Sequence, residues 1–355
     1  MANFTVSSAV DTMMQSSDSA GIRSSVGVVD YPFTTDAIGS TVQTRNLTSI
    51  TASSGFYGQN VASLYVGSNV TSIGSYAFQY GNVTSITIAN GLTSIGSAAF
   101  KYGGPISIII PDSVTSIGTE AFMYSNLQNV TLPTNDSFTT INSSSFAYSS
   151  VASIIIPDSV TSIGTGAFQM SSLASITIPS SLTSIGSNAF GYTSITSFTI
   201  PSSITLGSSV FQMSNIRSVT FEEGTTTTGS GSFYYCSGLN SVTLPQSLTS
   251  IGSSAFARCQ SLTSITIPNG VTSIGSNSFY YCGLTSVTMP SSVTSIGSYA
   301  FGYSQNLSTI NCLATTAPSL GSGAFAYTGN GTIHVPVGAT GYGTTYGGLT
   351  VIADL

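Results

Sequence analysis

Cysteines are the first side chains to examine for chemistry, because thiolates bind metals and act as nucleophiles. Cys236, Cys259 and Cys282 each stand three residues after a phenylalanine, in consecutive copies of a repeat. This placement predicts a ladder with one thiol per coil instead of a convergent cluster, and no further ligands are spaced to complete a metal site. We therefore expect neither a metal nor a cofactor, and interpret the position as a slot for a small buried side chain. Cys312 lies outside the ladder and has no obvious partner.

Patterns typical of enzymes do not occur in the sequence. His334 is the only histidine, and neither a nucleophile nor an acid is spaced to work with it, so we interpret it as a residue of a C-terminal cap. Glu222 and Glu223 are adjacent, and their carboxylates therefore face apart instead of forming an acid–base pair. Glycines such as those of "GSGSF" lack the strand-to-helix context of a phosphate-binding loop. We predict that the protein is not an enzyme.

Tyrosine has the most regular placement of the reactive residues. It stands two positions after the phenylalanine of most repeats, and Met170, Met213 and Arg258 replace it in three of them. Two interpretations stay open: each ring stacks on the next and shields the edge of the coil, or the column is a contact face, since tyrosine offers rigid area and a hydroxyl at small entropic cost. In the second interpretation the candidate receptor contacts are Tyr80, Tyr102, Tyr124, Tyr148, Tyr192, Tyr235, Tyr281, Tyr303 and Tyr327.

One repeated phrase must position these side chains. "LTSIGSNAFGYTSITSFTIPSS" (residues 182–203) recurs in near-copies whose phenylalanines are 21–24 residues apart. A fixed period of this length predicts a solenoid of stacked coils. The thirteen phenylalanines of the series are Phe56, Phe78, Phe100, Phe122, Phe146, Phe168, Phe190, Phe211, Phe233, Phe256, Phe279, Phe301 and Phe325.

Each repeat predicts a short strand, a proline that ends the strand, and a return segment whose apolar side chains point back to the core. In one copy Leu173, Ile176 and Ile178 alternate with small or hydroxylated residues, and Pro179 then removes a backbone donor and ends the strand. Gly186 is expected to allow the turn of the return segment. The apolar residues expected to point back to the same axis are Leu182, Ile185, Ala189 and Phe190. A coil of about 22 residues cannot fold alone, so we expect the coils to stack at roughly 4.8 Å.

Charge is scarce in this chain. The 355 residues include five basic and eleven acidic side chains, for a net charge of -6, and only 5% of residues are charged. Serine and threonine hydroxyls must therefore keep the surface hydrated. No basic patch could neutralise a row of phosphates, and no apolar run is long enough to span a bilayer. We expect neither a nucleic-acid partner nor membrane insertion.

The repeated phrase is similar to a known type of repeat. "LTSITIPNGVTSIGSNSFYYC" (residues 262–282) resembles the leucine-rich repeat of BspA-like and treponemal proteins, and the resemblance covers roughly residues 46–336. The C-terminal stretch, with its VP, paired tyrosines and final short strand, resembles the closing segment of that family. The expected fold class is mainly β: a right-handed leucine-rich-repeat solenoid of about thirteen coils of 21–24 residues with short strands. The expected domains are an N-terminal attachment segment (1–45), the solenoid (46–317), and the last coil with a C-terminal cap (318–355).

Residues 1–45 do not share the period. "SAVDTMMQSSDSAGIRSSVGV" (residues 8–28) resembles a short segment of bacteriophage tail fibres and other virion appendages, in which small residues lead to an arginine and then to an apolar–glycine–apolar close. The resemblance implies that Arg23, Val26 and Gly27 help to attach the chain to other virion structural proteins. A plain helix capping the solenoid is the structural alternative. We expect no export signal, since the first residues show neither a basic start nor an apolar run, and this expectation favours a protein assembled on a particle inside the cell.

These features predict a bacteriophage virion protein, a tail fibre or similar appendage, located on the particle surface. Its repeat array would bind a host-surface glycan or protein through the tyrosines and through threonine rows of the strands, such as Thr177, Thr199, Thr243, Thr266 and Thr288. The alternatives are a BspA-like adhesin of the bacterial cell surface, and a structural decoration or spacer without a receptor. Fibre proteins are often trimers, so a homo-oligomer stays open, although no heptad pattern signals one.

Overall fold

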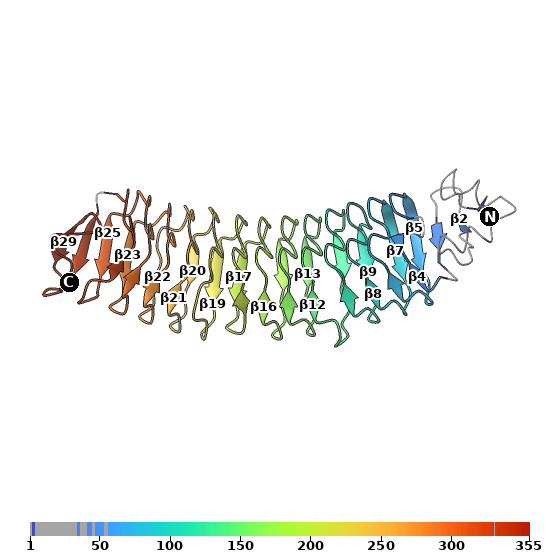
Figure 1. Ribbon diagram of the computed structural model, residues 1–355, viewed down its shortest axis with the longest axis horizontal. Helices are drawn as coiled ribbons and strands as arrows, with labels where there is room; N and C mark the ends of the chain where they lie inside the picture. The colour runs from blue at the N-terminus through green and yellow to red at the C-terminus, as the bar shows by residue number, and fades with distance from the viewer. Residues whose placement is uncertain (1, 4–33, 36–40, 45–46, 53–55, 330) are drawn as a thin grey trace. The chain divides into compact units, whose positions relative to one another are not determined.

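The computed structural model describes residues 2–3, 34–35, 41–44, 47–52, 56–329 and 331–355. They form two compact units, Met1–Leu182 and Thr183–Leu355, which we call unit 1 and unit 2. Each unit is a solenoid in which short strands of successive coils lie side by side (Figure 1). The predicted mainly β solenoid is confirmed. In the described part of the chain, no helix is long and apolar enough to cross a bilayer.

Unit 1 carries two rows of parallel strands, because each repeat contributes one strand before its proline position and a shorter one at "TSIG". Each residue pairs with its counterpart in the next repeat, as Ile108 does with Val130 and Ile154 with Ile176. The first row comprises β3 (Thr41–Gln43), β5 (Val61–Val66), β7 (Val83–Ile88), β9 (Ser107–Ile109), β11 (Asn129–Thr131), β13 (Ser153–Ile155) and β15 (Ser175–Thr177). The second comprises β4 (Ser49–Ile50), β6 (Ser72–Ile73), β8 (Ser94–Ile95), β10 (Ser116–Ile117), β12 (Thr140–Ile141) and β14 (Ser162–Ile163). In addition, β1 (Ala2–Asn3) pairs antiparallel with β2 (Thr34–Thr35).

Unit 2 repeats the two rows and ends in a small mixed sheet. Its first row comprises β17 (Ser197–Ile200), β19 (Ser218–Phe221), β20 (Ser241–Thr243), β23 (Ser286–Met289), β25 (Thr309–Cys312), β27 (Thr332–Val335) and β29 (Leu349–Ala353). The second comprises β16 (Ser184–Ile185), β18 (Thr205–Leu206), β21 (Ser250–Ile251), β22 (Ser273–Ile274), β24 (Ser295–Ile296) and β26 (Ser319–Leu320). Strand β28 (Thr345–Tyr346) turns antiparallel against β29 and closes the sheet.

The phenylalanine series forms the core of both units. All thirteen side chains are at most 2% exposed. Their rings stack coil on coil: the centroids of Phe78 and Phe100 are 5.1 Å apart with planes at 3°, and those of Phe211 and Phe233 are 5.4 Å apart, also at 3°. The four apolar residues predicted to return to the axis, from Leu182 to Phe190, are also buried. Stacking is therefore what buries the apolar half of each repeat.

The glycine of "TSIG" has a different role from the predicted one. Neither Gly96 nor Gly118 has the positive φ that would make glycine necessary for the turn itself. A Cβ on Gly96 would instead lie 2.4 Å from the backbone nitrogen of Ser75, and a Cβ on Gly118 would lie 2.4 Å from that of Ser97. The neighbouring coil thus passes too close for any side chain, and glycine serves the stacking of coils instead of the turn.

The C-terminal cap is held by two buried tyrosines. The hydroxyl of Tyr342 donates to the carbonyl oxygen of Ala314 at 2.8 Å, and that of Tyr346 donates to the carbonyl of Pro318. Tyr342 also lies 3.2 Å from the sulfur of Cys312, which gives this cysteine the partner that the sequence did not reveal. The cap covers the last coil, whose bare edge would otherwise expose unpaired backbone groups.

Candidate functional site

The tyrosine column is the most distinctive exposed feature of both units. The turn after each phenylalanine places the residue two positions later in the left-handed region, with φ of 62° at Tyr102 and 55° at Tyr148. Left-handed backbone is uncommon for residues with a Cβ, and glycine or asparagine adopts it more cheaply. Gly58 holds this slot after Phe56, with φ of 70°, and from Phe78 onward the twelve residues in it are Tyr80, Tyr102, Tyr124, Tyr148, Met170, Tyr192, Met213, Tyr235, Arg258, Tyr281, Tyr303 and Tyr327.

A second left-handed column in the same coils provides an internal comparison. It lies two residues before each phenylalanine, and it accepts small, polar, acidic and aromatic residues alike: Tyr76, Ala98, Glu120, Ser144, Gly166, Asn188, Ser209, Gly231, Ser254, Asn277, Tyr299 and Gly323. From Phe78 onward the first column holds only tyrosine, methionine and arginine. Because the backbone conformation is shared, it does not explain the difference, and the large side chains must be kept for their contacts.

In unit 1 the tyrosine rings stack on one another. The centroids of Tyr80 and Tyr102 are 4.8 Å apart with planes at 2°, and those of Tyr102 and Tyr124 are 4.8 Å apart with planes at 5°. Tyr124 and Tyr148 continue the stack at 4.2 Å. These rings nonetheless stay exposed, by 52% at Tyr80 and 43% at Tyr102. Stacking covers the ring faces and leaves the edges and hydroxyls available to a partner.

Hydrogen bonding and charge modify this column locally. A hydrogen bond to Tyr148 raises the pKa of Tyr124. Lys101 lies over the ring of Tyr102, with its Nζ 5.3 Å from the centroid, and forms an ion pair of 2.6 Å with Glu120. The hydrogen bond to Glu120 raises the pKa of Lys101. The single lysine on the column is thus already neutralised by an acid of the chain.

The column of unit 2 is interrupted by an arginine. The guanidinium carbon of Arg258 lies 5.5 Å from the ring centroids of both Tyr235 and Tyr281, within the range of cation–π attraction. Tyr303 and Tyr327 follow with centroids 4.5 Å apart and planes at 33°. The rings of Tyr303 and Tyr327 are therefore tilted, and the guanidinium of Arg258 stands where other coils have a tyrosine ring.

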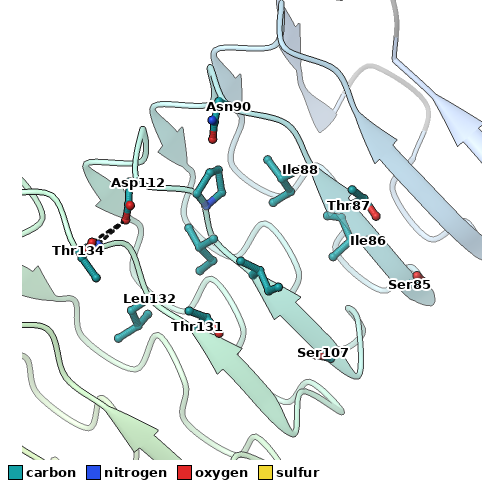
Figure 2. Close-up of a pocket in the computed structure, with 13 residues that line it drawn as sticks. Ser85, Ile86, Thr87, Ile88, Asn90, Ser107, Asp112, Thr131, Leu132 and Thr134 are labelled. Atoms are coloured by element: carbon teal, nitrogen blue, oxygen red, sulfur yellow. Dashed lines mark hydrogen bonds between the residues drawn. The ribbon is translucent and has the colours of Figure 1, made fainter.

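A shallow groove of about 660 Å³ lies over the first strand row of unit 1 (Figure 2). Serine and threonine hydroxyls line it together with isoleucine side chains, and residues of β7, β9 and β11 contribute to it. A second hollow of about 470 Å³ shares Ser107, Thr131 and Leu132 with it and extends over β13 and β15. Two isoleucines on this face point into solvent: Ile109 is 70% exposed and Ile155 is 74% exposed.

The threonine rows predicted as contacts are exposed, and the two isoleucines interrupt them. Thr177, Thr199, Thr243, Thr266 and Thr288 all lie on the surface, two residues before a proline. Ile109 and Ile155 occupy the same position relative to Pro111 and Pro157, and sequence reasoning missed them. An alignment on the prolines instead of the phenylalanines would have revealed the substitution.

Asp112 lies at the rim of the groove and binds the next coil. Its carboxylate accepts hydrogen bonds from the backbone nitrogen of Thr134 at 2.7 Å and from the Thr134 hydroxyl at 3.0 Å (Figure 2). Both bonds favour the ionised form and lower the pKa of Asp112. This carboxylate is engaged in joining two coils.

The cysteine ladder is buried and unreactive. Cys236, Cys259 and Cys282 are at most 4% exposed, and their thiols donate to backbone carbonyls, for example Cys259 to Phe233 at 3.2 Å. Burial raises the pKa of Cys236 to about 11 and that of Cys282 to about 12. Ser149 fills the same slot and donates to the carbonyl of Phe146 at 2.7 Å. These contacts agree with the interpretation that the position three residues after each phenylalanine takes a small buried side chain. Over the described residues, no group of three or more potential ligands is placed to hold a metal.

The remaining predicted residues fall outside a common site. His334 lies in the cap, where its Nδ1 is 2.9 Å from a carboxylate oxygen of Asp354. Glu223 accepts hydrogen bonds from the backbone of Gln246 and Ser247 in the next coil. The proposed attachment residues Arg23, Val26 and Gly27 lie outside the described residues, and their role stays a prediction.

The repeats identify the family. The chain matches the BspA type leucine-rich repeat region, in six copies, over residues 48–151, 139–250 and 226–344. These matches span most of its length, so the protein belongs to this family of leucine-rich repeat proteins. Such solenoids are typically non-enzymatic.

Solved structures contain the same fold. A leucine-rich repeat protein from Bacteroides ovatus is 25% identical, with a TM-score of 0.61 over 83% of this chain and 84% of that one. The pneumococcal vaccine antigen PcpA is 22% identical, with a TM-score of 0.51 over 85% and 84%. A leucine-rich repeat protein from Eubacterium ventriosum is 22% identical, with a TM-score of 0.50 over 81% and 82%. No curated protein sequence matches the chain significantly.

Proposed function

We propose that this protein is an adhesion-type leucine-rich repeat protein of the bacterial cell surface, which binds a glycan or protein of another surface through its tyrosine column. Membership of the BspA type supports the general class. The virion interpretation depends on an expected lack of an export signal and on the resemblance of residues 8–28, which lie outside both the family match and the described residues. We therefore prefer the cell surface to the bacteriophage particle as its location.

The contrast between the two left-handed columns carries this proposal. Both columns have the same backbone conformation, and only the first holds a large side chain in every coil from Phe78 onward, whereas the second holds one only at Tyr76, Glu120 and Tyr299 among small and polar residues. A column needed only to shield the coil could hold any large apolar side chain, and tyrosine dominates this one. Tyrosine is well suited to a contact face, since its ring gives rigid area and its hydroxyl tolerates water.

The neutral surface fits the same role. Contacts made by rings and hydroxyls are not screened by salt, whereas exposed ion pairs are. Each repeat offers a similar small contact, and many weak contacts between two surfaces multiply into firm attachment. The array is therefore suited to adhesion by avidity.

Adhesion of protein-coated beads to host cells tests the proposal. The double variant Tyr102→Ser/Tyr124→Ser removes two exposed rings of the column and should reduce bead attachment by about tenfold. Tyr76→Ser is the matched control, because Tyr76 has the same φ of 61° and is 50% exposed but belongs to the second column. Thermal unfolding confirms that each variant is folded. Equal attachment by wild type and double variant would leave a structural spacer as the better description.

A further inference from the structure

Arg258 is held between two aromatic rings of neighbouring coils. Its guanidinium carbon lies 5.5 Å from the centroid of Tyr235 on one side and 5.5 Å from that of Tyr281 on the other, and 5.9 Å from that of Tyr280. Rings on both sides of a guanidinium attract the cation and restrain the side chain, while its N–H groups can still donate hydrogen bonds. The side chain is therefore restrained, with its donors free to meet a ligand.

The charge of Arg258 is not neutralised by the chain. Among the described residues the ion pairs are Lys101 with Glu120 and His334 with Asp354, and neither involves Arg258. Lys101, the other cation beside a tyrosine column, has its acid at 2.6 Å. Arg258 thus offers an unpaired positive charge on an otherwise neutral contact surface, in a protein with a net charge of -6.

We propose that Arg258, Tyr235 and Tyr281 form a site for an acidic glycan, and this inference rests on the tyrosine column being the contact face. The guanidinium edge binds one anionic group, a carboxylate or a sulfate, through parallel N–H···O bonds. The flanking tyrosines contact the C–H faces and hydroxyls of the sugar rings on either side. Cation–π attraction to the two rings holds the arginine in place, so less side-chain freedom is lost on binding.

Charge favours a sparsely charged glycan over an acidic protein face. A net charge of -6 repels an extended negative surface, and the neighbouring column residues offer no further cation to hold one. One arginine between rings matches a single acidic sugar in a hydroxyl-rich chain. Its binding should weaken with salt, as expected for a contact that depends on one charge.

Three oligosaccharides with the same lactose core test the site by calorimetric titration: 3′-sialyllactose with one carboxylate, 3′-sulfolactose with one sulfate, and neutral lactose. Wild type should bind at least one acidic ligand and should not bind lactose measurably. The two acidic ligands distinguish carboxylate from sulfate as the anion. Absence of binding to both would overturn the proposal.

The variant Arg258→Met removes the charge and keeps the packing, because Met170 and Met213 hold the same slot in other coils. It should weaken binding by about tenfold or more, and Arg258→Lys should weaken it less, since lysine keeps the charge and loses the planar fork. The converse change, Met213→Arg, puts an arginine between Tyr192 and Tyr235 and should raise the number of bound ligands. Equal binding by wild type and Arg258→Met would refute the site.

The bead assay separates this inference from the proposed function. If Arg258→Met beads attach as wild type does while the Tyr102→Ser/Tyr124→Ser beads do not, the acidic-glycan site is wrong and the adhesion proposal stands. If the tyrosine variant attaches normally, the adhesion proposal fails. In that case the glycan titration of wild type and Arg258→Met is the remaining test of the Arg258 site.

Discussion

Phe100 and Phe122 stack in adjacent coils, with ring centroids 5.2 Å apart and planes at 3°. Each ring fills the space between its two neighbours in the column, so a cavity at one coil weakens the coils on both sides. Phe122→Ala should lower the free energy of unfolding by about 3–5 kcal/mol. Urea unfolding followed by circular dichroism measures this loss. The exposed Thr131→Ala is the control and should change stability by less than about 0.5 kcal/mol; similar losses in both variants would contradict a continuous core.

Gly118 should not tolerate even a methyl group. A Cβ there would lie 2.4 Å from the backbone nitrogen of Ser97, and backbone of the neighbouring coil cannot move aside cheaply. Gly118→Ala should therefore destabilise the protein by about 1–3 kcal/mol or more. Gly238→Ala is the matched control, because its nearest atom would be a carbonyl oxygen 3.8 Å away. Thermal unfolding of the two variants should differ clearly, and equal melting temperatures would disprove the close approach.

The buried thiols should make stability fall in alkaline solution. In the unfolded chain a cysteine ionises near pH 9, whereas burial raises the pKa of Cys236 to about 11 and that of Cys282 to about 12. The folded state therefore keeps its protons where the unfolded state releases them, and this contribution to stability is complete below pH 9 and is lost as pH rises towards 11–12. Replacement of Cys236, Cys259 and Cys282 by serine, which fills the slot in other coils, should remove this component. Denaturant unfolding between pH 8 and pH 11 tests it, and identical pH profiles for both proteins would argue against it.

The phenylalanine period and the alternating apolar positions were enough to predict the strands and the inward-pointing apolar residues that follow them, because one coil is repeated and its apolar positions recur. Features that depend on the distance between neighbouring coils could not be predicted from the period of the sequence. The reason for Gly96 became clear only from its 2.4 Å approach to Ser75, and the place of Arg258 between two rings depends on the spacing of three coils. Ile109 was missed for another reason, since the repeats were aligned on phenylalanine.

Asp112 should titrate below the usual range because of Thr134. Its two hydrogen bonds favour the carboxylate, so this contribution to stability is present above the unfolded pKa of 3.8 and is lost as pH falls through the lower pKa of the folded state. Thr134→Val removes the hydroxyl and keeps the backbone donor, and the pKa of Asp112 should rise part of the way to its ordinary value. Carboxyl NMR titration measures this pKa directly. Thr131→Val, on the preceding strand, is the control that should leave it unchanged.

Neighbouring isoleucines on β13 should respond in opposite ways to the same substitution. Ile154 points into the solenoid and is 5% exposed, whereas Ile155 points outward and is 74% exposed. Ile154→Thr places a hydroxyl among apolar side chains and removes buried carbon, so it should cost about 1–3 kcal/mol of stability. Ile155→Thr restores the residue that most repeats hold at this position and should change stability by less than about 0.5 kcal/mol. Chemical unfolding of the two variants decides the point: comparable destabilisation by both would mean that Ile155 is covered in solution, as it would be if a partner or a second copy occupied the strand groove.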